Sequence, residues 1–475
     1  MNKRIIYYCL LLFVLADIGY TFYQHLQVPL DGDISGGVIP TEVTNQILED
    51  PFGFKVITQG AVYPNPNRFF AHWMFSGYFR TVPFIFQKIA SPLDSIYLSA
   101  AFAKTIIQLL MIVLLARFIT GNKNVAAKNY IMAMALVTPL FQSNGYRSYM
   151  GIIDHSITYT FFYALPACLL LIFCLPFFHR IFHKNISMSR ALAAGLMLLA
   201  VILIFSGPLQ PGIFLVLILL CGIFFIMKAG VLSQKNSPTG LLKALKQIPR
   251  TYLFFIVLTG ALSLYSLYLG THNSIFAGED MPVTERYARL PEGLYYLVTQ
   301  KIGFPVLLIM LIINFFLMKK QFATNEGKKI IALFKWIGLF SLLYIALLPL
   351  GGYKNYRPYI LRYDTVMPVT IALILLYGIS TYFLIKNYRR SWYLCPVIAV
   401  AIIFTLADQP QTGANQCEKN ALNAIAQSKE RIVLLNTDCT IMSWNKITQP
   451  ENSAQNTQLL RFWGVLAEEK LYYQK

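Results

Sequence analysis

The stretch "IIYYCLLLFVLADIGYTFYQHLQVPLDGDISGGVIP", Ile5 to Pro40, joins a long apolar run to an acidic loop. Residues 5–24 approach the roughly 20 apolar residues that cross a bilayer core of about 30 Å. The basic start "NKR" resembles a signal peptide, but no small-residue cleavage site follows before the acidic loop. We therefore interpret residues 5–24 as a retained first membrane span.

The composition of the whole chain is typical of a polytopic membrane protein. Of its 475 residues, 56% are hydrophobic and 13% are charged, and the mean hydropathy is +0.54. A soluble domain has about 25% charged residues. The net charge of +19 comes from short Lys/Arg clusters between apolar runs, as expected where loops meet an anionic leaflet. We expect a lipid bilayer around this chain and no nucleic acid partner.

The apolar runs predict an all-α polytopic membrane protein with about eleven transmembrane helices. Lys and Arg concentrate in alternate connections, and this bias orients membrane proteins with their basic loops in the cytoplasm. It predicts a cytoplasmic N-terminus and a long extracytoplasmic first loop, residues 25–95. The eleven candidate spans are 5–24, 96–118, 130–143, 157–178, 191–207, 211–228, 251–270, 303–318, 334–350, 367–386 and 393–408.

One apolar stretch of the first loop tests this count. Residues 69–86, "FFAHWMFSGYFRTVPFIF", carry His72, Arg80 and Pro83 among apolar side chains. We interpret them as a helix that lies on the outer surface, or as a re-entrant turn. The alternative is a twelfth span, which would invert every later loop and place the basic connections outside.

The chain divides into two parts. Residues 1–408 form the transmembrane domain, and residues 409–475 form a small extracytoplasmic C-terminal segment. Of the seven cysteines, Cys417 and Cys439 lie in that segment, where an oxidising compartment would permit a disulfide. Two unrelated free thiols are the alternative. The other five lie in apolar runs and are expected to be packing residues.

Basic and aromatic residues gather in one predicted outer connection, "GGYKNYRPYILRYDTVMP", residues 351–368. Basic residues are disfavoured on this side, yet the stretch holds Lys354, Arg357 and Arg362 together with Tyr363 and Asp364. The planar guanidinium suits phosphate oxygens, and tyrosine rings stack on sugars. The stretch therefore predicts a substrate-binding cluster. The alternative is an interfacial belt in which Arg362 and Asp364 pair with each other.

The acids of the outer loops suggest further roles. Asp154 and His155 resemble an acid–base pair at the start of a span, although adjacent residues need not face one site. Three explanations compete for Asp31-Gly32-Asp33: a solvated turn, a site for a divalent cation such as Mg²⁺ or Mn²⁺, or a general base that takes a proton from a hydroxyl.

This layout resembles the GT-C superfamily of integral membrane glycosyltransferases, and also uncharacterised multi-pass proteins of bacterial envelopes. GT-C members carry one or two acidic residues in the extracytoplasmic loop after the first span, followed by surface-lying helices. Asp31 and Asp33 match the position of these acids, and Arg68 and His72 lie in the region of the surface helices. The resemblance covers the architecture and no long motif.

The resemblance implies an inverting glycosyltransferase in the bacterial inner membrane with its active site facing the periplasm. The donor would be a polyprenyl-phosphate sugar, and the acceptor a glycan, a lipid or a protein. Asp31 is the favoured base, with Asp33 orienting the acceptor or holding a metal. A transporter or flippase without chemistry is the rival class, but the chain shows no internal repeat and no matching pair of broken helices.

Overall fold

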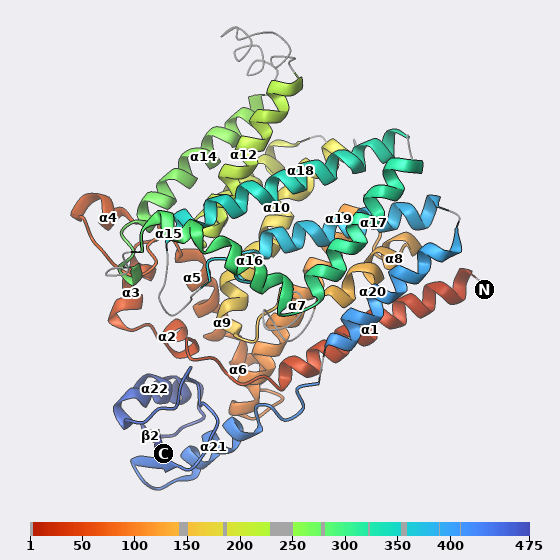
Figure 1. Cartoon of the computed structure of the whole chain (residues 1–475). Helices are drawn as coiled ribbons and strands as arrows, with labels where there is room; N and C mark the ends of the chain where they lie inside the picture. The colour runs from red at the N-terminus through yellow and green to blue at the C-terminus, as the bar shows by residue number, and fades with distance from the viewer. Residues whose placement is uncertain are drawn as a thin grey trace.

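The computed structural model describes residues 3–141, 151–183, 188–228, 250–276, 281–321, 324–352, 359–388, 390–408 and 410–475. Nearly all regular structure within these ranges is helical, with one pair of short strands. The predicted all-α class is therefore confirmed. The long helices form one tilted bundle, and the C-terminal residues lie at one end of it (Figure 1).

Eight helices in the described residues are long and apolar enough to cross a membrane, which confirms the polytopic character. Each coincides with one of the eleven predicted spans. One of the eight is continuous from Ile157 to Phe182, made of α9 (Ile157–Tyr159), a π-helical turn η3 (Thr160–Ala164) and α10 (Leu165–Phe182). The other seven are α1 (Lys3–Leu26), α7 (Pro92–Thr120), α12 (Leu209–Lys228), α14 (Arg250–Gly270), α17 (Gly303–Gln321), α18 (Asn325–Leu347) and α19 (Met367–Asn387).

Three predicted spans form shorter helices. Residues 130–143 correspond to α8 (Lys128–Val137), residues 191–207 to α11 (Arg190–Ile204) and residues 393–408 to α20 (Leu394–Ala407). Their lengths are 10, 15 and 14 residues. All three contribute to the hydrophobic cores of the bundle. The count of eleven crossings stays a prediction.

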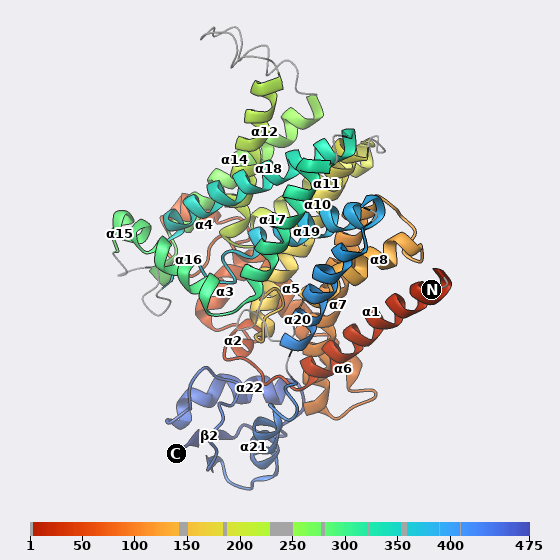
Figure 2. The same cartoon turned by 45° about the vertical axis from the view of Figure 1, so that its right-hand side comes forward.

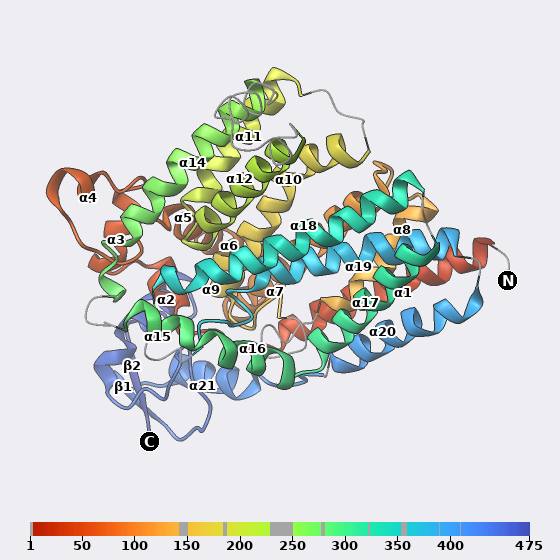
Figure 3. The same ribbon diagram turned by 45° about the horizontal axis from the view of Figure 1, so that its top comes forward.

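The connections between the long helices gather at two ends of the bundle. At one end, the backbone N–H of Phe70 in the first loop donates to the carbonyl of Phe205, between α11 and α12. At the other end, Lys329 at the start of α18 donates to the carbonyl of Phe182, the last residue of α10. The sidedness that the charge pattern predicts for these connections stays a prediction. Figure 3 shows α17, α18 and α19 running between the two ends.

The first loop folds into short helices. Residues 69–86 form α5 (Phe69–Phe79) and α6 (Val82–Phe86), which are 11 and 5 residues long, so no single long helix runs through this stretch. The interpretation of this stretch as a surface-lying helix or a re-entrant turn stays a prediction. α5 buries Phe75 and Phe79 and leaves Trp73 exposed. The remaining helices of the outer connections are α2 (Ile34–Val38), α3 (Glu42–Glu49), α4 (Phe54–Gln59), α15 (Val283–Ala288) and α16 (Leu290–Thr299).

Residues 410–475, here called the C-terminal unit, pack directly on the first loop (Figure 2). A disulfide joins Cys417 to Cys439, which decides between the two alternatives that the sequence left open. Apolar side chains of the unit form one continuous core with α2, α5 and the start of α7, because neither part buries its apolar face alone. Its elements are α21 (Gln416–Gln427), α22 (Ala454–Phe462) and the parallel strands β1 (Ile432–Leu435) and β2 (Leu471–Gln474).

Candidate functional site

Asp31 lies at the centre of a buried polar cluster between the first loop and the start of α9. Its carboxylate accepts hydrogen bonds from Ser156 Oγ at 2.7 Å and from Thr158 Oγ1 at 2.8 Å. The backbone N–H groups of Thr158 and Asp33 donate to it at 3.0 Å each. Four donors occupy its oxygens, so a fifth proton donor would have to displace one of them. Asp31 therefore ties the first loop to residues 156–158.

The local sequence explains why residues 154–158 hold this shape. Ser156 is the N-cap of α9, and its Oγ accepts a hydrogen bond from the backbone N–H of Tyr159 at 3.1 Å. The Asp154 carboxylate accepts one from the N–H of Ser156 at 2.7 Å. One hydroxyl thus caps the helix and binds Asp31 as well.

Lys104 supplies the positive charge of the cluster. It lies in α7 with 1% of its surface exposed, and its ammonium donates to the carbonyl of His155. The charges of Asp154 and Asp31 are close enough to act on it. A buried charge is tolerated when opposite charges and hydrogen bonds compensate for the lost water. The three charged side chains therefore form a buried acid–lysine cluster at the end of the bundle.

Asp154 is the acid of this cluster whose proton affinity suits chemistry near neutral pH. Burial raises the pKa of its carboxyl to about 7. The N–H of Ser156 and the charge of Lys104 oppose this shift, whereas the charges of Asp364 and Asp31 add to it. A general base works best when its pKa is close to the operating pH. By contrast, Asp33 is exposed.

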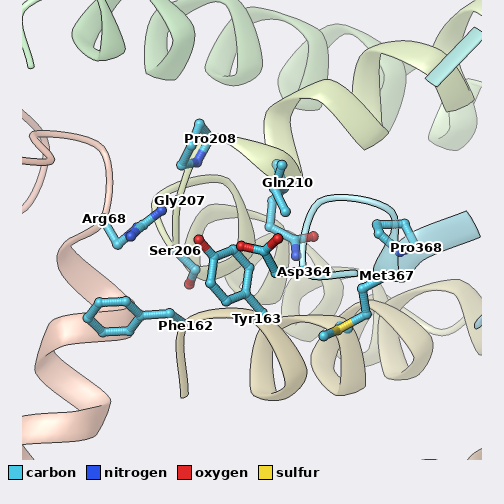
Figure 4. Close-up of a pocket in the computed structure, with 12 residues that line it drawn as sticks. Arg68, Phe162, Tyr163, Ser206, Gly207, Pro208, Gln210, Asp364, Met367 and Pro368 are labelled. Atoms are coloured by element: carbon cyan, nitrogen blue, oxygen red, sulfur yellow. The ribbon is translucent and has the colours of Figure 1, made fainter. Parts of the chain in front are cut away.

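A pocket lies beside the cluster, where three connections meet the helix that contains Phe162 and Tyr163 (Figure 4). Its cavity volume is about 10 Å³, room for about one water molecule, so the lining side chains nearly fill it. Arg68, Ser206, Gln210 and Asp364 point into the space around Tyr163 (Figure 4). The remaining lining is mostly apolar, with Phe162, Met367 and Pro368 on its walls. Such a mixture of apolar walls and few polar groups is typical of a ligand site.

Arg68 is the cation of this pocket. Its guanidinium carbon lies 5.1 Å from the ring centre of Phe162 and 5.8 Å from that of Tyr163. Its Nε is buried and has no hydrogen-bond partner among the described residues, and the same holds for Gln210 Oε1. His72, on α5, packs its ring on Phe162 at 4.7 Å, and burial lowers its pKa to about 3. His72 is therefore neutral beside the pocket.

Arg362 pairs with Asp364, as the belt alternative predicts. Its Nε and Nη2 lie 3.1 and 3.3 Å from the two carboxylate oxygens, and its Nη1 donates to the carbonyl of Tyr359. Tyr363 is buried, and its hydroxyl has no partner in the described part of the chain. Lys354 and Arg357 lie outside the described residues. Of the predicted substrate-binding residues of this stretch that the structure describes, Asp364 lines the pocket.

The metal explanation for Asp31 and Asp33 finds no group to support it. Among the described residues, no three His, Cys, Asp or Glu side chains are placed to hold a metal ion. The Asp31 oxygens face hydroxyl and amide donors, which repel a cation. A divalent cation at Asp31 and Asp33 stays a prediction.

Comparison of the chain with family models, curated proteins and solved structures gave no match. The site must therefore be interpreted from its own residues.

Sequence analysis missed three residues of this site. Lys104 had a visible signal, because a single charge interrupts the apolar run of α7 and charged residues inside spans are often functional. Tyr163 and Gln210 carried no such signal in the sequence, because each lies in an apolar stretch that is far from the first loop. Of the predicted residues, the structure brings Asp31, Asp154 and His155 together in the cluster. It places Arg68, Asp364 and the neighbouring His72 at the pocket.

Proposed function

We propose that this chain is an integral membrane glycosyltransferase that moves a sugar from a polyprenyl-phosphate donor to an envelope acceptor. One observation carries the proposal. A buried carboxyl with a pKa near neutrality, Asp154, lies in a cluster beside a pocket that contains an arginine with a free donor, Arg68. The pairing of a base with an anion-binding cation is what transfer from a lipid phosphate requires.

In the proposed reaction, Asp154 takes the proton of the acceptor hydroxyl. The hydroxyl oxygen then bonds to the anomeric carbon of the donor sugar, and the bond from that carbon to the phosphate oxygen breaks. The electron pair leaves with the lipid phosphate, and Arg68 stabilises its charge. Attack opposite to the leaving phosphate inverts the configuration at the anomeric carbon. Asp31 holds the Asp154 segment in place, and Asp33 faces the solvent side, where an acceptor arrives.

We further propose eleven crossings with the site on the periplasmic side of a bacterial inner membrane. The C-terminal unit packs on the first loop, so both lie on one side of the membrane. If α1 crosses the bilayer, the total number of crossings must then be odd. The eight long helices alone are an even number. Adding α8, α11 and α20 makes eleven and keeps the basic connections together.

A direct assay tests the proposal. The purified chain in lipid nanodiscs receives radiolabelled polyprenyl-phosphate mannose, arabinose or glucose together with an envelope extract as the source of acceptors. We expect label to move from the lipid fraction into acceptor with at least one donor. The Asp154→Asn variant should lower this transfer by roughly 10²–10⁴-fold. Asp438→Asn, which changes an exposed acid of the C-terminal unit, is the matched control and should leave it unchanged.

Two results would contradict the proposal. If no labelled sugar leaves any of these donors, the glycosyltransferase reading fails. If intact donor instead moves between leaflets in proteoliposomes, the chain is a flippase. We expect transfer to persist in EDTA, because the site residues do not form a metal-binding group.

A further inference from the structure

The C-terminal unit contacts the segment that carries Asp31 at its backbone. The side chain of Asn415 donates to the carbonyl of Leu26 at 2.8 Å, and Ser35 Oγ donates to Asn456 Oδ1 at 2.5 Å. The indole N–H of Trp463 donates to the carbonyl of Phe79 at 2.9 Å. Figure 2 shows α21 and α22 against the first loop. Leu26 and Ser35, which make two of these contacts, lie on either side of Asp31 in the sequence.

Glu418 makes the contact that is nearest to Asp31. Only 1% of its surface is exposed, and its Oε2 accepts hydrogen bonds from the N–H of Leu30 at 2.9 Å and from Tyr97 Oη at 2.7 Å. Its Oε1 accepts one from the N–H of Met442 at 2.9 Å. Leu30 directly precedes Asp31. One buried carboxylate therefore joins the first loop, α7 and the C-terminal unit.

A second contact explains the glycine of the acidic loop. A Cβ atom on Gly32 would lie 2.6 Å from the backbone nitrogen of Trp444, closer than Cβ atoms approach other atoms in folded proteins. The Trp444 ring also stacks on Tyr159, with centroids 5.6 Å apart and planes at 25°. Trp444 thus lies between the acidic loop and the start of the helix that Asp31 binds. Gly32 is required for this close approach.

The disulfide closes the part of the unit that holds Glu418. Cys417 directly precedes Glu418 in the sequence. Cys439 lies three residues before Met442, whose backbone N–H donates to Glu418. The bridge therefore fixes the donor segment against α21. Without it, residues 439–444 would be tied to α21 by weaker contacts alone, and the conformational entropy of that loop would rise.

We propose that Glu418 is a positioning residue that sets the place of the acidic loop, and that the intact disulfide is needed for it to do so. The path runs from Glu418 to Leu30 and Asp31, and from the Asp31 carboxylate to Thr158 and the Asp154 segment. The structural part of this inference stands by itself. Its consequence for turnover rests on the proposed glycosyl transfer.

Amide hydrogen exchange tests the structural part on the full chain in nanodiscs. Glu418→Gln leaves one oxygen for two facing N–H groups, so we expect exchange to quicken at least about tenfold in peptides with Leu30 and Met442. If Glu418 positions the loop, the Thr158 amide, which donates to Asp31, should quicken as well. Glu430→Gln, an exposed glutamate of the same unit, is the matched control and should change none of them.

Two further measurements guard against a variant that fails to fold. Tyr97→Phe removes one of the three bonds to Glu418 without changing the packing, and should give a smaller rise in the same peptides. Reduction of the wild-type disulfide should reproduce the Glu418→Gln pattern, and the two changes together should not add. Unchanged exchange at Leu30 in both variants would overturn the contact. Faster amide exchange at Leu30 without faster exchange at Thr158 would overturn the positioning role.

The turnover part has its own readout. Glu418→Gln should lower kcat about tenfold or more and leave the donor KM within about twofold, because Arg68 lies on another segment of the pocket. An equal rise in KM would mean that the whole site is distorted, and would overturn selective positioning. Failure of wild-type transfer would count against the proposed function only, because the exchange pattern does not depend on it.

Discussion

Individual carboxyl groups of the site differ because their surroundings differ. Asp31 accepts four hydrogen bonds and Asp33 is exposed, whereas Asp154 combines burial with neighbouring charges of both signs. Two carboxyl groups in different surroundings commonly take different roles. The assignment of the base to Asp31 stays a prediction, and the geometry favours Asp154 as base with Asp31 as its anchor.

The pH dependence of transfer separates these roles. Because burial raises the pKa of Asp154 to about 7 and only the carboxylate accepts a proton, kcat/KM should fall about tenfold per pH unit below that value. Lys104, Asp31 and Asp364 are the charged groups that face it. Asp154→Asn should lower kcat by roughly 10²–10⁴ and remove the acid limb. Asp31→Asn should lower activity but keep the fall of kcat/KM at low pH. If Asp31→Asn removes that fall and Asp154→Asn keeps it, Asp31 is the base.

Arg68 should dominate donor binding. Arg68→Ala should raise the donor KM by about tenfold to a hundredfold, because a charge-assisted hydrogen bond contributes about 1.5–3 kcal/mol. Lysine should rescue only in part, because it lacks the planar fork. Arg362→Ala is the matched comparison and should change KM less, since that guanidinium is already engaged by Asp364. Donor titrations measure both, and a larger effect at Arg362 would contradict this assignment.

At the scale of elements, the C-terminal unit has a buried acid that makes its stability depend on pH. Burial raises the pKa of Glu418 from 4.5 to about 7, while the N–H of Leu30 and the hydroxyl of Tyr97 oppose the shift and Asp31 adds to it. The folded unit therefore binds a proton more tightly than the unfolded chain does. The contribution of Glu418 to the stability of the unit is therefore greatest below about pH 4.5, and it falls as the pH rises toward 7.

Thermal unfolding of the unit between pH 5 and 8 measures this effect. The slope from one proton is at most about 1.4 kcal/mol per pH unit. Glu418→Gln should flatten the slope, and Glu430→Gln should leave it as in the wild type. Stability that rises with pH in this range would contradict the sign, because it would require a carboxyl whose pKa is lowered by folding.

At the scale of the whole molecule, the proposed topology predicts which sites reagents reach. Single cysteines are introduced in a chain that lacks its five free cysteines but keeps the Cys417–Cys439 disulfide. An impermeant thiol reagent should label Ser274→Cys and Asn452→Cys in intact cells with a permeable outer membrane. It should label Asn325→Cys only after lysis. Labelling of Asn325→Cys with none at Ser274→Cys would invert the proposed orientation.

The sequence by itself determined the helical class, and its eleven predicted spans include the eight long apolar helices of the described residues. Hydrophobic length and Lys/Arg bias act locally along the chain, so they can be read without neighbours in space. It also indicated that polar chemistry gathers in the outer loops. The role of each polar residue in these loops could not be predicted from the sequence. Its burial and hydrogen bonds depend on residues more than a hundred positions away, as for Asp31 and Thr158.

Only the tertiary structure decided how these residues meet. It placed Lys104 beside Asp31 and Asp154, paired Arg362 with Asp364, and put Arg68 in a pocket with Gln210. It also joined the C-terminal unit to the first loop in one core, which the polar composition of residues 410–475 did not predict. The physical reason is that a proton affinity, a free donor or a close approach is a property of an environment, and packing between distant segments creates that environment.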